Sequence, residues 1–363
     1  MKTTAAVLRD PAGAYAIEEV DLGEPRDDEV LVRVVASGLC HTDVVPRSTG
    51  LSPFPIVTGH EGAGVVEAVG ASVEGVAVGD HVVLSFDSCG TCPACAAGVP
   101  AHCETMLFRN LVGRRLDGTT AMTDGSGDDV SNRWFGQSSF ATHCLATARN
   151  VVVVDPGLPL ERLGPLGCGV QTGAGSVVIS LAVQPGESLV VLGAGAVGLS
   201  AVMAGVVAGA TTIVAVDLHA HRLDLARELG ATHVVDASEA DVAAEVLAVT
   251  GVGAHAVLDT TGVPDVMRAA LAAARPGGRV GFVGVQTGDL VLDPLALVGK
   301  VVHGILEGGA DPQDLIPRMI GWWQDGRFPF DRLIETFPLA EINEAEEASL
   351  SGRVVKPVLL TGA

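Results

Sequence analysis

The pattern of apolar and polar positions changes once along the chain, near residue 163. Before that point, short runs rich in β-branched residues alternate with turns containing Gly, Pro and Asp. Such runs include Val30–Val35, Gly64–Val69 and His81–Leu84. Short strands separated by turn signals are typical of an antiparallel, barrel-like β region. The polar stretch around Leu116–Arg133 is predicted to be a surface loop.

After residue 163, apolar β-branched runs alternate with runs rich in Ala and Leu, which predicts a parallel sheet covered by helices. The predicted strands are Ser188–Leu192, Thr212–Val216, Thr232–Val235, Ala256–Asp259 and Arg279–Val283. The predicted helices are Val197–Gly209, Arg222–Leu229, Asp241–Thr250 and Pro264–Ala274. Residues 188–216 carry no charge and are long enough to span a bilayer. Their strand–glycine–helix–strand pattern favours buried parallel strands instead.

A strongly negative net charge argues against several classes of partner. The 363 residues contain 22 Lys and Arg against 43 Asp and Glu, a formal net charge of −21. Nucleic-acid binding requires a basic face, and anionic membranes attract basic segments, so neither partner is expected. Hydrophobic residues make up 48% of the chain, enough for a full core. The N-terminal residues lack the apolar segment of a signal peptide, so we expect a cytoplasmic protein.

A glycine-rich hexapeptide links the first two predicted strands of the parallel sheet. Ser188–Leu192 runs into Gly193-Ala-Gly195-Ala-Val-Gly198, and the next strand ends at Asp217, nineteen residues after Gly198. This context matches the dinucleotide-binding fingerprint, in which the glycines admit the pyrophosphate at a helix N-terminus. Asp217 would bind the adenosine ribose hydroxyls and repel a 2′-phosphate, which favours NAD over NADP. The alternative is a structural glycine turn that binds nothing.

Four of the seven cysteines fall within fifteen residues. Cys89, Cys92, Cys95 and Cys103 have spacings of three, three and eight. Four thiolates on one loop make a closed tetrahedral zinc site, whose role is structural because no position stays open for substrate. An iron–sulfur cluster or free structural cysteines are the alternatives. The odd number of cysteines in a long chain argues against a disulfide framework.

Further motifs are dispersed along the chain. They are Gly38-Leu-Cys-His-Thr-Asp43, Gly59-His-Glu-Gly-Ala-Gly64, Gly79-Asp80, Gly167-Cys-Gly169 and Lys356-Pro357. Together with the four-cysteine lobe and the glycine loop, they resemble the zinc-containing medium-chain alcohol dehydrogenases over essentially the whole chain. The segment Gly167–Gly175 most resembles the aryl and allylic branch, which includes benzyl-alcohol and geraniol dehydrogenases.

The resemblance implies a split GroES-like β-barrel catalytic domain with an inserted Rossmann domain. The expected boundaries are residues 1–163 and 308–363 for the catalytic domain and 164–307 for the NAD-binding domain. It also implies a homo-oligomer, either a dimer or a tetramer, and two zinc ions per chain. The expected reaction is the reversible oxidation of a primary aryl or allylic alcohol with hydride transfer to NAD. Alternatives are a thiol-adduct (formaldehyde-type) or polyol dehydrogenase, and a catalytically silent binding protein on the same fold.

The resemblance also assigns roles near the catalytic zinc. Cys40, His60 and Cys168 would hold the ion, with Glu61 behind it as a transient ligand. Asp43 would orient His60, and Thr42 would take the substrate proton. Many relatives carry a histidine three residues after Thr42, at the end of a proton relay, where this chain has Val45. The route of the proton beyond Thr42 therefore stays open.

Further residues are assigned to the cofactor and the substrate on the same basis. His41 and Lys356 would contact the pyrophosphate, Arg222 the adenosine ribose, and Thr172 and Val197 the nicotinamide. The expected pocket lining, with ordinary core packing as the alternative, is Ser85, Phe86, Phe140, Val283 and Leu306. Val283 is also counted with the cofactor site. Cys144 is expected to be a buried small apolar residue.

Overall fold

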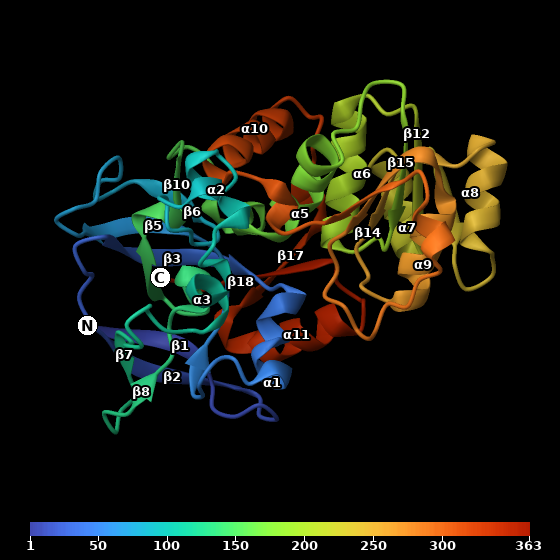
Figure 1. The fold of residues 1–363 in the computed structure, drawn as a ribbon. Coiled ribbons are helices and arrows are strands. Elements are labelled where there is room, and N and C mark those ends of the chain that lie inside the picture. The colour runs from blue at the N-terminus through green and yellow to red at the C-terminus, as the bar shows by residue number, and fades with distance from the viewer. The chain divides into compact units, whose positions relative to one another are not determined.

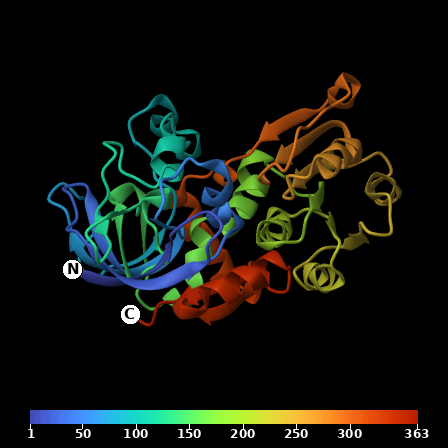
Figure 2. The same cartoon turned by 90° about the horizontal axis from the view of Figure 1, so that it is seen from below.

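The computed structural model describes residues 1–363 and divides into two compact units. The first unit comprises Met1–Cys168, Asp311–Ile316 and Leu333–Ala363, and the second comprises Gly169–Ala310 and Pro317–Arg332. Both ends of the chain lie in the first unit (Figure 2). The domain boundaries expected at residues 163/164 and 307/308 stay a prediction.

The first unit is built from two largely antiparallel sheets that form a nearly closed barrel. One sheet has the order β4-β1-β2-β7-β8, and the other has the order β10-β6-β5-β3-β18-β17, with β9 also paired to β3. The strands are β1 (Lys2–Leu8), β2 (Tyr15–Leu22), β3 (Glu29–Gly38), β4 (Ile56–Val57), β5 (Glu61–Val69), β6 (His81–Leu84), β7 (Met122–Thr123), β8 (Asp129–Val130), β9 (His143–Thr147), β10 (Val151–Val154), β17 (Ile334–Pro338) and β18 (Lys356–Leu360).

Strand β18 joins the last segment of the chain to the N-terminal part of the barrel. It pairs antiparallel with β3 and parallel with β17, so it lies inside the sheet (Figure 1). Val358 and Leu359 have no exposed surface. Apolar side chains of β1, β2 and β18 share one buried cluster with residues that follow the four-cysteine segment. The barrel core is thus complete only when residues far apart in the sequence meet.

The second unit is a six-stranded parallel sheet with the order β13-β12-β11-β14-β15-β16. In sequence order this is 3-2-1-4-5-6, the arrangement of dinucleotide-binding sheets. The strands are β11 (Ser188–Leu192), β12 (Thr212–Asp217), β13 (His233–Asp236), β14 (Ala254–Asp259), β15 (Ala274–Phe282) and β16 (Val301–Gly304). Strand β11 is buried along its whole length, as its unbroken apolar run predicts.

Helices cover the parallel sheet and occupy the connections of the barrel (Figure 1). Around the sheet lie α5 (Gly169–Gly175), α6 (Ala196–Ala208), α7 (Ala220–Glu228), α8 (Val242–Thr250) and α9 (Pro264–Ala273). The others are α1 (Pro46–Thr49), α2 (Pro93–Ala96), α3 (Met106–Leu111), α4 (Leu160–Leu163), α10 (Pro312–Gln324) and α11 (Ile342–Leu350). None of the helices combines the length and the apolar character needed to cross a bilayer.

The predicted fold class is confirmed, and each strand and helix expected after residue 163 overlaps an observed one. The stretch 116–133 differs from the expected surface loop. It contains the small hairpin of β7 and β8, and the side chains of Asp124 and Arg133 are buried. Arg9, which is remote in the sequence, forms an ion pair with Asp124 and thereby holds this polar stretch against the barrel.

We predict that Leu359→Ala lowers the free energy of unfolding by about 2–5 kcal/mol, because it empties a fully buried position in β18. The matched control is Leu350→Ala, at the end of α11, where the leucine is 57% exposed. That change should stay within about 0.5 kcal/mol. Urea unfolding followed by tryptophan fluorescence measures both. Equal effects of the two substitutions would contradict the placement of β18 inside the sheet.

Candidate functional site

Four side chains with metal-binding atoms converge in the first unit. The ligand atoms of Cys40, His60, Glu61 and Cys168 all lie within 4.8 Å of one another. Cys40 follows β3, His60 and Glu61 stand at the start of β5, and Cys168 ends a short helical turn. His60, Glu61 and Cys168 are buried. The structure therefore brings together residues that are up to 128 positions apart in the sequence.

Two glycines allow the segment before Cys168 to approach the barrel strands. A Cβ atom on Gly164 would lie 2.2 Å from the carbonyl oxygen of Glu61. A Cβ atom on Gly167 would lie 2.0 Å from the carbonyl oxygen of Leu84. Only glycine permits such approaches of backbone to backbone. The segment can therefore place the Cys168 thiol beside the residues that begin β5.

The carboxylate of Asp43 holds this cluster in place. Its Oδ1 accepts hydrogen bonds from His60 Nδ1 at 2.8 Å, from the Gly59 amide at 2.9 Å and from an indole N–H at 3.1 Å. Its Oδ2 accepts the Cys40 amide at 3.1 Å. The same carboxylate therefore fixes both the loop of Cys40 and the ring of His60, as an orienting partner of a metal-binding histidine does.

The donor set fits a zinc ion. Nδ1 of His60 is bonded to Asp43, whereas Nε2 is buried and has no hydrogen-bond partner. A buried polar atom without a partner is costly unless a ligand satisfies it. A hydrogen bond from Cys168, together with the neighbouring His60, lowers the pKa of Cys40 well below its usual range. Two sulfur atoms and one imidazole nitrogen are typical zinc ligands.

Glu61 forms a buried ion pair with Lys356. Lys356 Nζ lies 2.9 Å from both carboxylate oxygens and 3.2 Å from the carbonyl oxygen of Leu39. Burial alone lowers the pKa of Lys356, but the adjacent Glu61 outweighs it and raises that pKa. Lys356 is only 2% exposed. Its ammonium group thus lies against Glu61, a different contact from the expected one with the cofactor pyrophosphate.

The other cysteine cluster lies on one lobe of the first unit. The sulfur atoms of Cys89, Cys92, Cys95 and Cys103 lie within 4.8 Å of one another. The amides of Thr91 and Cys92 point at Cys89 Sγ, at 3.4 and 3.2 Å. These amides lower the pKa of Cys89 to about 5. Four sulfur atoms at this spacing fit a closed tetrahedral zinc site, which binds cysteine as the thiolate.

Two aromatic residues complete the surroundings of His60 and were missed by sequence reasoning. The ring of Phe135 stacks on His60 with centroids 4.3 Å apart, and Trp134 donates its indole N–H to Asp43. Gln137 bonds to the carbonyl oxygens of His60 and Ser85, each at 3.0 Å. The only sequence signal for their role is that these two aromatic residues, Trp134 and Phe135, directly follow the polar stretch at residues 116–133.

In the second unit, the glycine loop joins β11 to α6. Gly193 has a φ of +92°, which favours glycine, and donates its amide to Val216. A Cβ atom on Gly198 would lie 1.8 Å from the carbonyl oxygen of Gly193, so the loop and helix are in contact. A Cβ atom on Gly195 would meet nothing within 4 Å. The open space at the N-terminus of α6 fits the approach of a pyrophosphate.

Asp217 ends β12 beside this loop. Its Oδ2 accepts the Ala194 amide at 2.7 Å, and its Oδ1 accepts the amide and ring Nδ1 of His219, both at 2.9 Å. Burial alone would raise the pKa of Asp217, but these hydrogen bonds and the positive charge of Arg222 outweigh it and lower the pKa. Arg222 Nη1 lies 4.0 Å from Asp217. The carboxylate is therefore ionised at neutral pH.

The remaining predicted residues are distributed between the two units. Thr42 Oγ1 lies 3.8 Å from Cys40 Sγ, and His41, on the same turn, is exposed. Phe140 is fully buried and contacts Tyr15 edge to face. The first unit also encloses Ser85 and Phe86, whereas the second unit carries Thr172 and Val197 on α5 and α6, Val283 after β15, and Leu306, which is 43% exposed. Cys144 is buried, and burial raises its pKa to about 12.

Comparison with known families matches both units. Residues 26–156 match the alcohol dehydrogenase GroES-like domain, and residues 196–322 match the zinc-binding dehydrogenase family. The chain is 48% identical to geraniol dehydrogenase of Castellaniella defragrans over 362 residues, which cover 98% of this chain and 97% of the relative.

Solved structures agree with these matches. A zinc-binding-domain alcohol dehydrogenase from Burkholderia ambifaria has a TM-score of 0.97 at 47% identity, with 99% of each chain covered. Benzyl alcohol dehydrogenase from Acinetobacter calcoaceticus has a TM-score of 0.95 at 40% identity, again over 99% of each chain. With both domains matched and relatives similar over their full length, the chain belongs to the zinc-containing medium-chain alcohol dehydrogenases.

Proposed function

We propose that the protein oxidises primary aryl or allylic alcohols to aldehydes, reversibly, with NAD as the hydride acceptor. The observation that carries the proposal is the cluster of Cys40, His60 and Cys168, in which a buried imidazole nitrogen has no hydrogen-bond partner. The substrate class is supported by the similarity to a geraniol dehydrogenase and a benzyl alcohol dehydrogenase.

In this proposal Cys40, His60 and Cys168 hold a catalytic zinc ion. When bound, zinc supplies a Lewis acid that makes the alcohol more acidic, and NAD accepts the hydride. Asp43 keeps Nε2 of His60 directed toward the two thiols by bonding Nδ1. Glu61 adds a carboxylate behind them, whose charge Lys356 balances. Cys89, Cys92, Cys95 and Cys103 hold a second zinc ion with a structural role.

Thr42 takes the alcohol proton in the proposed reaction. Its hydroxyl lies 3.8 Å from Cys40 Sγ, beside the proposed zinc ligands. Beyond Thr42, Val45 takes the place of a relay histidine and packs against the apolar core of the first unit. The neighbouring His41 is exposed, so it offers the proton a route to solvent.

The cofactor site is proposed along the glycine loop and β12. Gly193, Gly195 and Gly198 admit the pyrophosphate, while Asp217 and Arg222 bind the adenosine ribose. Thr172, Val197 and Val283 pack on the nicotinamide, and His41 supplies positive charge near the phosphates, whereas Lys356 pairs with Glu61. Ser85, Phe86, Phe140 and Leu306 are proposed to border the substrate. The proposal places the enzyme in the cytoplasm as a homo-oligomer.

The proposed roles of the two metal clusters differ, and substitutions should separate them. We predict that Cys168→Ser abolishes turnover with little loss of stability, whereas Cys95→Ser lowers the melting temperature, because a structural zinc contributes folding free energy. Metal analysis should give two zinc ions in the wild type and fewer in each variant. Cys144→Ser, outside both clusters, should keep both ions. Iron, or fewer than two sites in the wild type, would contradict the assignment.

NAD should be preferred over NADP because the ionised Asp217 would face a 2′-phosphate. This repulsion is worth a few kcal/mol, on the order of 10²-fold in kcat/KM. Asp217→Ser should reduce the preference. Asp224→Ser on α7, which removes the same charge from an exposed position, should leave it unchanged. Equal efficiency of the wild type with the two cofactors would rule out the role of Asp217.

An alcohol panel followed by NADH absorbance tests the proposed substrate class. Each additional buried CH₂ contributes about 0.8 kcal/mol, so benzyl and geranyl alcohols should exceed ethanol at least about tenfold in kcat/KM. Thr42→Ala should lose most activity, and Thr42→Ser should keep it. Preference for a polyol or a hydroxymethyl thiol would favour the alternative dehydrogenases. If the zinc-loaded protein turned over no alcohol, the remaining hypothesis would be a catalytically silent binding protein.

A further inference from the structure

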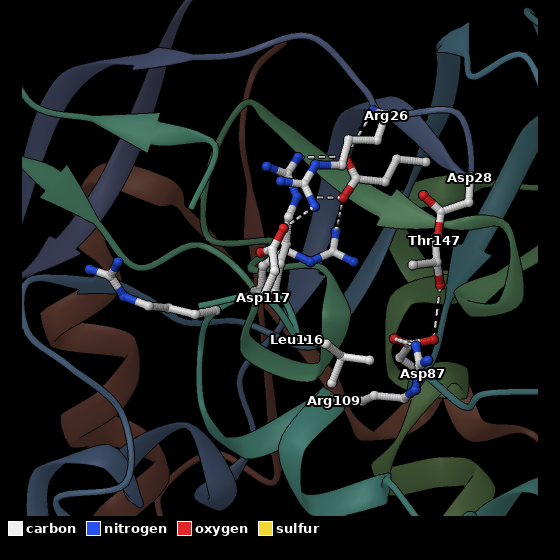
Figure 3. Close-up of a pocket in the computed structure, with 11 residues that line it drawn as sticks. Arg26, Asp28, Asp87, Arg109, Leu116, Asp117 and Thr147 are labelled. Carbon is white, nitrogen blue, oxygen red and sulfur yellow. Dashed lines mark hydrogen bonds and ion pairs between the residues drawn. The ribbon is translucent and has the colours of Figure 1, made fainter. Parts of the chain in front are cut away.

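A cavity of about 210 Å³ in the first unit lies outside the site described above. Its walls come from the turn before β3, the loop after β6, α3 and the loop that follows α3. Figure 3 shows Asp87, Arg109 and Thr147 at one end, and Arg26 and Asp117 toward the other. None of the predicted catalytic, cofactor, metal or substrate residues lines this cavity.

The lining is rich in charged side chains. Its arginines are Arg26, Arg109, Arg114, Arg115 and Arg133, and its carboxylates are Asp28, Glu29, Asp87 and Asp117. Arg114 also pairs with Asp129, which lies outside the lining, at 2.9 Å. Where guanidinium groups gather around a cavity, one that lacks a counter-ion of its own favours an anionic ligand.

Three of the carboxylates are already bound to arginine or hydroxyl groups. Arg115 binds both oxygens of Glu29, at 2.8 and 2.6 Å. The two oxygens of Asp87 accept Arg109 at 3.0 Å and Thr147 at 3.0 Å.

At the other end of the cavity, Arg26 binds Asp117 at 2.8 Å. These ion pairs fix the orientation of the guanidinium groups of Arg26, Arg109 and Arg115.

Arg133 is the arginine without a carboxylate of its own. Arg133 is 4% exposed. Its nearest carboxylate is Glu29, which lies 3.6 Å away and already binds Arg115. Nη1 donates to the carbonyl oxygen of Leu145 at 2.9 Å. Burial lowers the pKa of this guanidinium. A buried cation that shares its counter-ion is unfavourable unless another anion compensates it.

We propose that this cavity binds a small tetrahedral oxyanion, phosphate or sulfate, with Arg133 as the central donor. Guanidinium groups present planar pairs of N–H donors that match the oxygen atoms of such anions. The volume of this cavity is smaller than that of typical cofactor and drug-sized pockets, which start at about 300 Å³. A free anion, or the phosphate of a small phosphomonoester at the mouth of the cavity, would both supply the required chemistry.

The position of the cavity gives the bound anion a structural effect. Asp87 stands two residues before Cys89, and Arg109 lies on α3, which begins three residues after Cys103. Because Arg109 also binds Asp87, an anion that bridges Arg133 and Arg109 would connect the barrel with the segments before and after the four cysteines. Oxyanion binding should therefore stabilise the zinc-loaded protein against heat, since a ligand that binds only the folded state raises its melting temperature.

Calorimetric titration of the zinc-loaded protein with inorganic phosphate tests the proposal. Saturating NAD is present so that the glycine loop is not a competing site, and ionic strength is held constant with chloride. Sulfate and glycerol 3-phosphate are titrated in parallel. Saturable binding of one phosphate per chain is expected, together with a higher melting temperature. Binding of phosphate but not of glycerol 3-phosphate would identify a free anion as the ligand, and binding of both would identify a phosphate group.

Two arginine substitutions and a matched control locate the site. Arg133→Met should weaken phosphate binding about tenfold or more, because hydrogen bonds to a charged donor are lost. Arg109→Gln, at a position whose side chain is 20% exposed, provides a second variant if Arg133→Met does not fold. Arg279→Gln is the control, since Arg279 is 26% exposed and pairs with Glu187 in the second unit. Absence of binding, or equal binding by all variants, would overturn the proposal.

Discussion

The geometry of the metal-binding cluster depends on the carboxylate of Asp43. Four donors from three segments of the chain converge on it: the amides of Cys40 and Gly59, the ring of His60 and the indole of Trp134. In a buried environment each donor would be costly if left unpaired. One side chain therefore sets the loop after β3, the start of β5 and the aromatic layer over the imidazole, and the zinc ligands keep the positions that these contacts give them.

The buried pair of Glu61 and Lys356 extends this arrangement to the far end of the sequence. Both side chains are essentially excluded from solvent, and each supplies the counter-charge of the other. Removing one partner of such a pair is strongly unfavourable, because it leaves an uncompensated buried charge. Strand β18, which begins with Lys356, is thus coupled electrostatically to the cluster, as well as through its backbone pairing with β3.

Much of the fold could be predicted because local patterns agree with it. In the parallel sheet, β-branched apolar runs alternate with helical runs, and the glycine loop marks the first of these connections. Helix α10 was not predicted, because Pro317 lies inside it and interrupts the helical signal. The zinc-ligand candidates came from motifs and resemblance, but the contacts of Trp134 and Phe135 with Asp43 and His60 arise only from tertiary packing. No periodicity or spacing encodes such contacts.

The interior position of β18 also constrains how the chain folds during synthesis. Every residue of the parallel-sheet unit leaves the ribosome before Lys356–Leu360 does. The parallel sheet can therefore form while the barrel still lacks a strand between β3 and β17. Until Lys356–Leu360 is made, residues 36–38 of β3 lack their partner strand, and an unpaired edge of this kind promotes aggregation and is shielded by chaperones. The barrel of the first unit can thus be completed only after the whole parallel-sheet unit has been synthesised.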